Sequence, residues 1–104
     1  MASRTRTLVG DRETLGRTDT VVVSPINVNA AVILPAIVDS LSHGYHGSQS
    51  SVLAGHAVRI RARGNGDLTV LDSHQQPVAV VASGASKSFT AEGNEAGDRW
   101  NVAQ

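Results

Sequence analysis

The chain has 104 residues, which is enough for one domain but not for two. Nine basic residues balance nine acidic ones, and this zero formal net charge argues against a general attraction to nucleic acids or membranes. The absence of cysteine excludes disulfides and thiolate metal sites. Because the chain also has just one Trp, one Tyr and one Phe, its core is light, and we expect a partner subunit to support it.

The first segment of the chain is polar and carries four arginines: Arg4, Arg6, Arg12 and Arg17. Residues 5–9 have the composition of a short strand, but the rest of the segment has little apolar material to pack. We therefore expect residues 1–18 to form an N-terminal arm that frays or orders on a partner. Residues 19–104 would form a single domain that still folds when the arm is removed.

Two strands are expected next. Residues 20–24 are β-branched and end before Pro25, which interrupts strand pairing. Residues 28–34 place apolar side chains at every second position, and Pro35 closes that run. Residues 36–41 have room for a single helical turn.

Apolar and basic residues alternate most regularly in the segment 56–63. The expected inward side chains are Val58, Ile60 and Ala62, and the expected outward ones are Arg59, Arg61 and Arg63. The Gly-Asn-Gly sequence at 64–66 tolerates positive φ and predicts a hairpin, with residues 67–71 as the return strand. The row of arginines is either a solvated face or a contact to a partner.

Three further strands are expected at residues 77–81, 86–91 and 99–103. In the last of these, Trp100 and Val102 share one face, and we expect Trp100 to be mostly buried. A strand about every ten residues, punctuated by Gly, Pro and Asn, predicts an all-β fold. The expected architecture is an antiparallel β-sandwich, jelly-roll-like domain or barrel.

No catalytic, cofactor or metal site is predicted. His43 and His46 lie three residues apart, but a metal needs further ligands with fixed geometry. Asp72, Ser73 and His74 have the residue types of a nucleophilic triad, yet adjacent residues cannot converge as a triad does. Tyr45, in a loop rich in Ser and Gly, is a candidate contact residue.

The order of several short motifs resembles a known group of proteins. A strand ends in Leu34-Pro35, a Val-Arg-Ile-Arg strand begins at Val58, a Gly-rich turn precedes Thr69-Val70, and a Gly-Asp-Arg-Trp-Asn-Val sequence ends at Val102. This pattern resembles the small β-domains of tailed-phage virion proteins, which occur in head decoration (cement) proteins and in fibre tips. The resemblance spans residues 21–102.

The resemblance implies a homotrimer on a virion, made in the host cytoplasm and placed on the capsid surface. Its partners would be copies of itself and the major capsid protein, with the arginine arm as one anchor. A chain of this length has no room for a fibre shaft, which favours the decoration protein. Two alternatives stay open: a receptor- or glycan-binding fibre tip, and a small cupin-like jelly-roll enzyme, which would need a His/Glu metal cluster.

Overall fold

The computed structural model describes residues 5–9, 12–23, 30–38, 51–63, 66–93 and 98–103, and these contain nine strands and no helix. The strands are β1 (Thr5–Thr7), β2 (Arg12–Thr14), β3 (Val21–Val23), β4 (Ala30–Ile33), β5 (Ala57–Arg61), β6 (Leu68–Leu71), β7 (Pro77–Val81), β8 (Ser86–Gly93) and β9 (Arg99–Ala103). The all-β prediction is confirmed. Instead of starting a helical turn, Ile37 forms a β-bridge with Val52.

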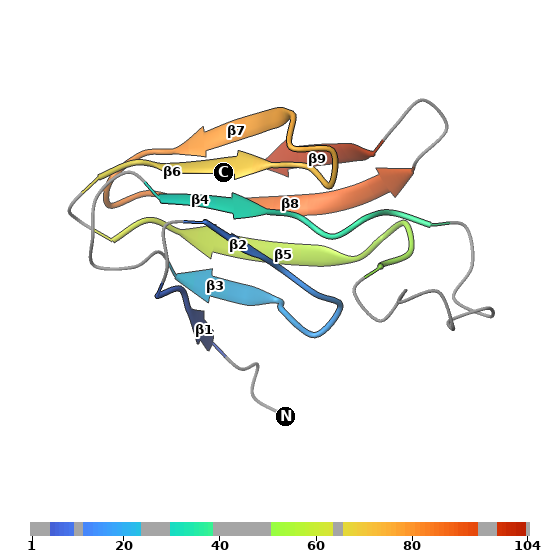
Figure 1. Cartoon of the computed structure of the whole chain (residues 1–104), viewed down its shortest axis with the longest axis horizontal. Coiled ribbons are helices and arrows are strands. Elements are labelled where there is room, and N and C mark those ends of the chain that lie inside the picture. The colour runs from blue at the N-terminus through green and yellow to red at the C-terminus, as the bar shows by residue number, and fades with distance from the viewer. Residues whose placement is uncertain are drawn as a thin grey trace.

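The strands form two mixed sheets (Figure 1). Sheet 1 has the order β1-β3-β5-β8-β9, and sheet 2 has the order β2-β4-β6-β7. One end of the domain is therefore formed by the edge strands β1 and β2, and the other end by the edge strands β7 and β9. In Figure 1, β7 and β9 lie together at the top of the view, whereas β1 lies at the bottom.

From β1 to β6 the chain alternates between the two sheets, and each strand pairs in parallel with the strand two before it. These six strands make three turns of a flat coil. The antiparallel pairing expected from the sequence occurs only among the last strands, in the pairs β6–β7, β5–β8 and β8–β9. Alternation of apolar residues shows which face is buried, but it is the same for parallel and antiparallel partners.

The hairpin expected at residues 64–66 is wrong. The strand before it, β5, pairs with β3 and β8, whereas the strand after it, β6, pairs with β4 and β7. The chain therefore crosses from sheet 1 to sheet 2 at this point. A Gly-containing segment permits a crossing between layers as readily as a tight turn, because the same backbone freedom serves both.

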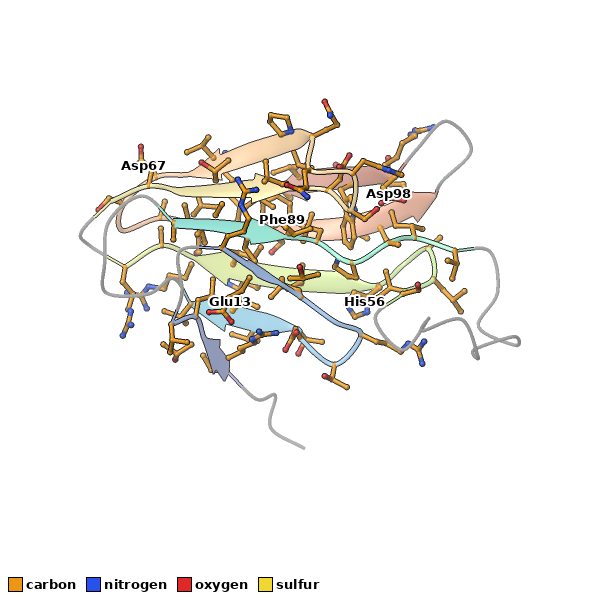
Figure 2. The ribbon with its side chains drawn as sticks, in the orientation of Figure 1. Glu13, His56, Asp67, Phe89 and Asp98 are labelled. Atoms are coloured by element: carbon orange, nitrogen blue, oxygen red, sulfur yellow. The ribbon has the colours of Figure 1, made fainter. Side chains whose placement is uncertain are left out.

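The two sheets share one hydrophobic core. Sheet 1 supplies Val22, Val58, Ile60 and Phe89, and sheet 2 supplies Val32, Leu68, Val70 and Val81. The inward positions predicted for residues 58, 60 and 62 are confirmed, since all three are at most 2% exposed. Figure 2 shows Phe89, the largest of these side chains, between the layers.

Residues 5–9 and 12–18, expected as part of an arm, lie within the domain. Strand β1 pairs with β3, strand β2 pairs with β4, and Leu8 and Leu15 are each 1% exposed in the core. The described residues therefore show no boundary at residue 18. The segment has few apolar residues, but Leu8 and Leu15 directly follow β1 and β2 and pack beside existing strands, which provide the missing packing partners.

Candidate interaction surfaces

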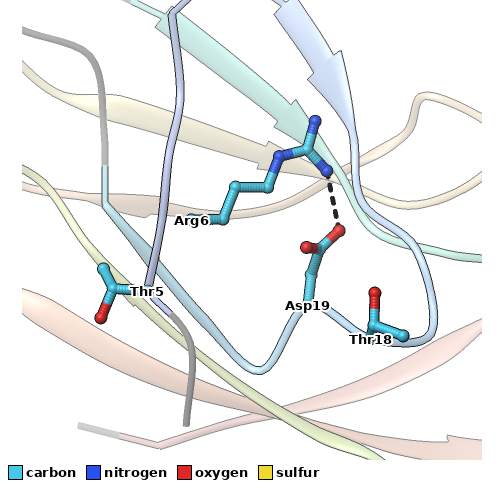
Figure 3. Close-up of a pocket in the computed structure, with 4 residues that line it drawn as sticks. All are labelled: Thr5, Arg6, Thr18 and Asp19. Atoms are coloured by element: carbon cyan, nitrogen blue, oxygen red, sulfur yellow. Dashed lines mark hydrogen bonds and ion pairs between the residues drawn. The ribbon is translucent and has the colours of Figure 1, made fainter.

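One end of the domain is closed by a cluster of charges, called here the charged end (Arg6, Glu13 and Asp19). Arg6 lies on β1 and Glu13 on β2, so the two side chains meet across the two layers. One guanidinium nitrogen of Arg6 lies 2.8 Å from Glu13 Oε1, and the other lies 2.7 Å from Asp19 Oδ2. Figures 2 and 3 show Glu13 and the Arg6–Asp19 pair.

Strand register explains how the charged end is positioned. In sheet 1, Arg6 is paired with Val22, and in sheet 2, Glu13 is paired with Val32. Both valines are fully buried, so Arg6 and Glu13 occupy inward positions in the outermost turn of the coil. Inward-pointing charges on edge strands discourage the pairing of further strands, because burying a charge without its water is costly.

The charged end also borders a hollow of about 340 Å³ lined by Thr5, Arg6, Thr18 and Asp19 (Figure 3). Burial acts to lower the pKa of Arg6, but hydrogen bonds and charge attraction to Glu13 and Asp19 together raise it above its ordinary value. The guanidinium is therefore committed to its two carboxylates.

His56 directly precedes β5 (Figure 2) and lies close to Asp19 of the charged end. Burial lowers the pKa of its imidazole, although a hydrogen bond to the Asp19 backbone and the Asp19 charge oppose the shift. Its Nε2 atom is buried and has no hydrogen-bond partner in the described part of the chain. The environment therefore favours the neutral ring over the imidazolium.

The opposite end of the domain is apolar and is called here the open end (Val78, Ala79, Trp100 and Val102). These side chains belong to the edge strands β7 and β9, pack against the core, and remain partly exposed. The prediction that Trp100 is mostly buried is confirmed, and the residue stays partly exposed because β9 is an edge strand of sheet 1. The indole Nε1 of Trp100 is buried and lacks an acceptor among the described residues.

A third surface is the outer side of sheet 1, called here the arginine face (Arg59 and Arg61, with the flanking residues Ser86 and Ser88). Both arginines are exposed, and the register pairs Arg59 with Ser88 and Arg61 with Ser86. Guanidinium nitrogens of Arg59 lie 3.1 Å from Ser86 Oγ and 3.5 Å from Ser88 Oγ. The outward orientation predicted for these two arginines is confirmed, and Arg63 is half-buried.

The remaining candidate contacts do not join these surfaces into one site. Arg12 donates a 2.8 Å hydrogen bond to Gln75 Oε1, and Arg17 donates a 2.9 Å bond to the Ser51 carbonyl oxygen. Arg4 and Tyr45 lie outside the described residues, as does the loop at 42–49 with its two histidines.

The Asp, Ser and His residues at 72–74 form a loop and not a catalytic triad. The Asp72 carboxylate accepts hydrogen bonds of 2.9 Å from the backbone N–H groups of His74 and Gln76, which uses it to shape the turn. The Ser73 hydroxyl instead donates to Asp98, which is labelled in Figure 2. Within the described ranges no three His, Asp or Glu side chains come together as metal ligands.

Comparison with protein-family models, curated proteins and solved structures found no match for this chain. The search for membrane-spanning segments, over the part of the chain that the structure describes, found no helix long and apolar enough to cross a bilayer. The three surfaces above are therefore the basis for a functional argument.

The charged end is the surface that sequence reasoning missed, although the sequence holds a signal for it. Arg6-Thr7-Leu8 and Glu13-Thr14-Leu15 are two copies of a charged-Thr-Leu pattern. A charge two residues before a leucine shares its face in a strand, so each copy predicts an inward charge beside an inward leucine. Their opposite signs would then have suggested an ion pair between two adjacent strands.

Proposed function

We propose that this chain is a non-catalytic structural module of a phage virion, which assembles into a homotrimer and decorates the capsid by binding the major capsid protein. Its two sheets would pack as a β-sandwich, and the copies would meet at the open end. The observation that carries the proposal is the half-exposed apolar core at β7 and β9. The motif resemblance supplies the virion setting and the trimer.

The open end favours association because it is the unfinished part of the core. The register continues the inward row Val32–Val70 to Ala79 on β7, and the row Val58–Phe89 to Val102 on β9. The first two members of each row are buried, and the last is partly exposed. Apolar surface removed from water contributes about 25 cal/mol per Å², so covering these last members favours association.

Trp100 adds a specific requirement to the interface. Its Nε1 atom is cut off from solvent and has no acceptor in the described residues. A buried donor without a partner costs about 1–3 kcal/mol, and a rotation of the indole that turns this N–H toward an acceptor of a neighbouring copy would remove that cost. Trp is also among the residues most enriched at the energetic centres of interfaces.

Association would support the capsid role through avidity. Three identical contacts on one trimer bind a symmetric lattice more tightly than a single contact, because the later contacts form intramolecularly. A ligand that binds the assembled lattice but not free subunits also shifts the equilibrium toward assembly.

The self-association is tested by light scattering on the purified chain, which should give about three times the 10.8 kDa chain mass. Val102→Lys, on the inner face of β9, should reduce the mass to that of a monomer. Ala103→Lys is the matched control, since residue 103 is the next position on β9 and is exposed. Trp100 is the sole tryptophan, so its emission should shift to the red as dilution separates the copies. A monomer with concentration-independent emission would refute the assembly.

The capsid role is tested separately by co-sedimentation with undecorated heads assembled from the major capsid protein of the same phage. The wild-type chain should pellet with the heads and raise the temperature at which they disassemble. Val102→Lys should pellet far less, because it has lost the multiple attachment, whereas Ala103→Lys should retain it. If the chain formed the oligomer but did not pellet with the heads, the self-association would still hold and the decoration role would be refuted.

A further inference from the structure

We infer that the arginine face is a docking surface for an acidic protein segment whose carboxylates repeat at alternate residues of an extended strand. This inference rests on the proposed function and names the chemistry of the capsid surface that the module would contact. It places the self-contact at the open end and the partner contact on the outer side of sheet 1.

The first argument is the state of the acidic residues. Each carboxylate in the described part of the chain is engaged within the chain. Glu13 and Asp19 bind Arg6, Asp67 accepts from the Ser83 N–H, Asp72 accepts from two backbone N–H groups, Glu92 lies 3.5 Å from Arg99, and Asp98 accepts from Ser73. Among the described residues no carboxylate is therefore left to pair with the arginine face.

The second argument is the charge that the face retains. Arg59 has hydroxyl partners but no carboxylate within ion-pair distance, and among the described residues no carboxylate forms an ion pair with Arg61. The positions that flank them in register are Val21, Val23, Ser86 and Ser88, none of which carries charge. Because like charges on one strand face repel, an acidic partner would relieve both arginines at once.

The third argument is geometric. Residues 59 and 61 are two apart on β5, the central strand of sheet 1, so their side chains leave the same face about 6.6 Å apart. Carboxylates at alternate residues of an extended segment have the same spacing. The hydroxyl groups of Ser86 and Ser88 also hold the Arg59 guanidinium in place, so less side-chain freedom is lost on binding.

A nucleic-acid partner fits the face less well. Binding to a phosphate backbone depends on many cationic contacts, whereas this face offers two arginines beyond the Arg99–Glu92 pair. Apart from its charged residues, the described outer face of sheet 1 carries Thr, Ser, Val, Ala and Asn. None of these side chains can stack on a base. Arginine is, in contrast, enriched at protein–protein interfaces.

The test measures fluorescence anisotropy of a labelled peptide of alternating Glu and Thr, with the Gln-Thr peptide as the uncharged control. The full-length chain should bind the Glu-Thr peptide and not the Gln-Thr peptide, and affinity should fall as salt rises toward ~0.15 M. Arg59→Gln combined with Arg61→Gln should weaken binding about tenfold, as two exposed ion pairs would. Replacing both by lysine should restore part of the affinity, since charge is kept but the forked geometry is lost.

The matched control is Arg12→Gln together with Arg99→Gln, which removes the same charge from positions outside the Arg59–Arg61 pair. It should leave peptide affinity within about twofold of the wild type. Light scattering on each variant keeps this test apart from the self-association, because the arginine variants should retain the wild-type mass. Equal loss in the control pair, equal binding of the Gln-Thr peptide, or tighter binding of a labelled DNA duplex than of the Glu-Thr peptide would overturn the inference.

Discussion

The apolar core between the two sheets ends differently at the charged end and at the open end. At the charged end, the last inward positions of the two sheets are Arg6 and Glu13, which pair with each other across the layers. At the open end, the corresponding edge strands carry Ala79 and Val102, which extend the core to its surface. An edge with paired inward charges resists further contacts, whereas an apolar edge favours them. The domain therefore has a charged end that resists association and an open end that favours it.

The largest effect is expected from removing residues 1–18, because this deletes β1 and β2 and exposes the core at the charged end. Burying Leu8 and Leu15 contributes about 1.5–3 kcal/mol for each side chain, and Val22 and Val32 would lose their cover as well. A domain with about 5–15 kcal/mol of total stability would then be largely unfolded at room temperature. Circular dichroism should show loss of the cooperative melt.

A shorter deletion of residues 1–4, which spares both strands, is the control for that experiment and should melt as the full chain does. If the chain without residues 1–18 melted cooperatively near the wild-type temperature, the first strands would be dispensable, as an arm would be.

An intermediate effect is expected from replacing the charges of the charged end by apolar side chains. Arg6→Leu alone leaves Glu13 and Asp19 without their guanidinium and should cost about 1 kcal/mol, a modest value because the Arg6 side chain is 36% exposed and screened by water. Combining it with Glu13→Leu should recover part of that loss, since an apolar pair can replace the Arg6–Glu13 pair at little cost, while Asp19 stays without its guanidinium.

The same double variant should also associate through its new apolar end. Light scattering should show species larger than the wild-type oligomer, and adding Val102→Lys should not remove them. A double variant with the wild-type mass would show that the charges do not prevent association through the charged end.

The smallest effect is expected from His56. Burial lowers the pKa of its imidazole, so the folded state binds fewer protons than the unfolded state near that pKa. Stability from this group is therefore complete above the ordinary histidine pKa of about 6.5 and declines as the pH falls through that value toward the lowered pKa of the folded state. The free energy of unfolding, measured by urea titration at a series of pH values, should decrease over this range.

The His56→Gln variant should show a flatter pH dependence, because the titrating group is gone. Identical slopes in the wild type and His56→Gln would mean that this imidazole does not contribute to the pH dependence of stability.

By itself the sequence determined which side chains are buried within the strands. The alternation around Val58 and Ile60 predicted their burial and the exposure of Arg59 and Arg61, because the side-chain period of a strand is two whatever its neighbours are. Composition and turn residues likewise predicted an all-β chain, although in place of the helical turn expected from residue 36 the structure has a bridge between Ile37 and Val52.

Only the tertiary structure decided which strands pair. The sequence placed a hairpin after Arg61, whereas the structure sends the chain to the other sheet and pairs β5 with β3 and β8. It also decided that residues 5–9 and 12–18 belong to the domain and that Trp100 lies at an edge. These outcomes depend on contacts between residues far apart in the chain, such as Arg6 with Asp19 and Val22 with Ile60. A local pattern fixes the inner face of each strand, but the free energy of burying that face depends on which other strands cover it.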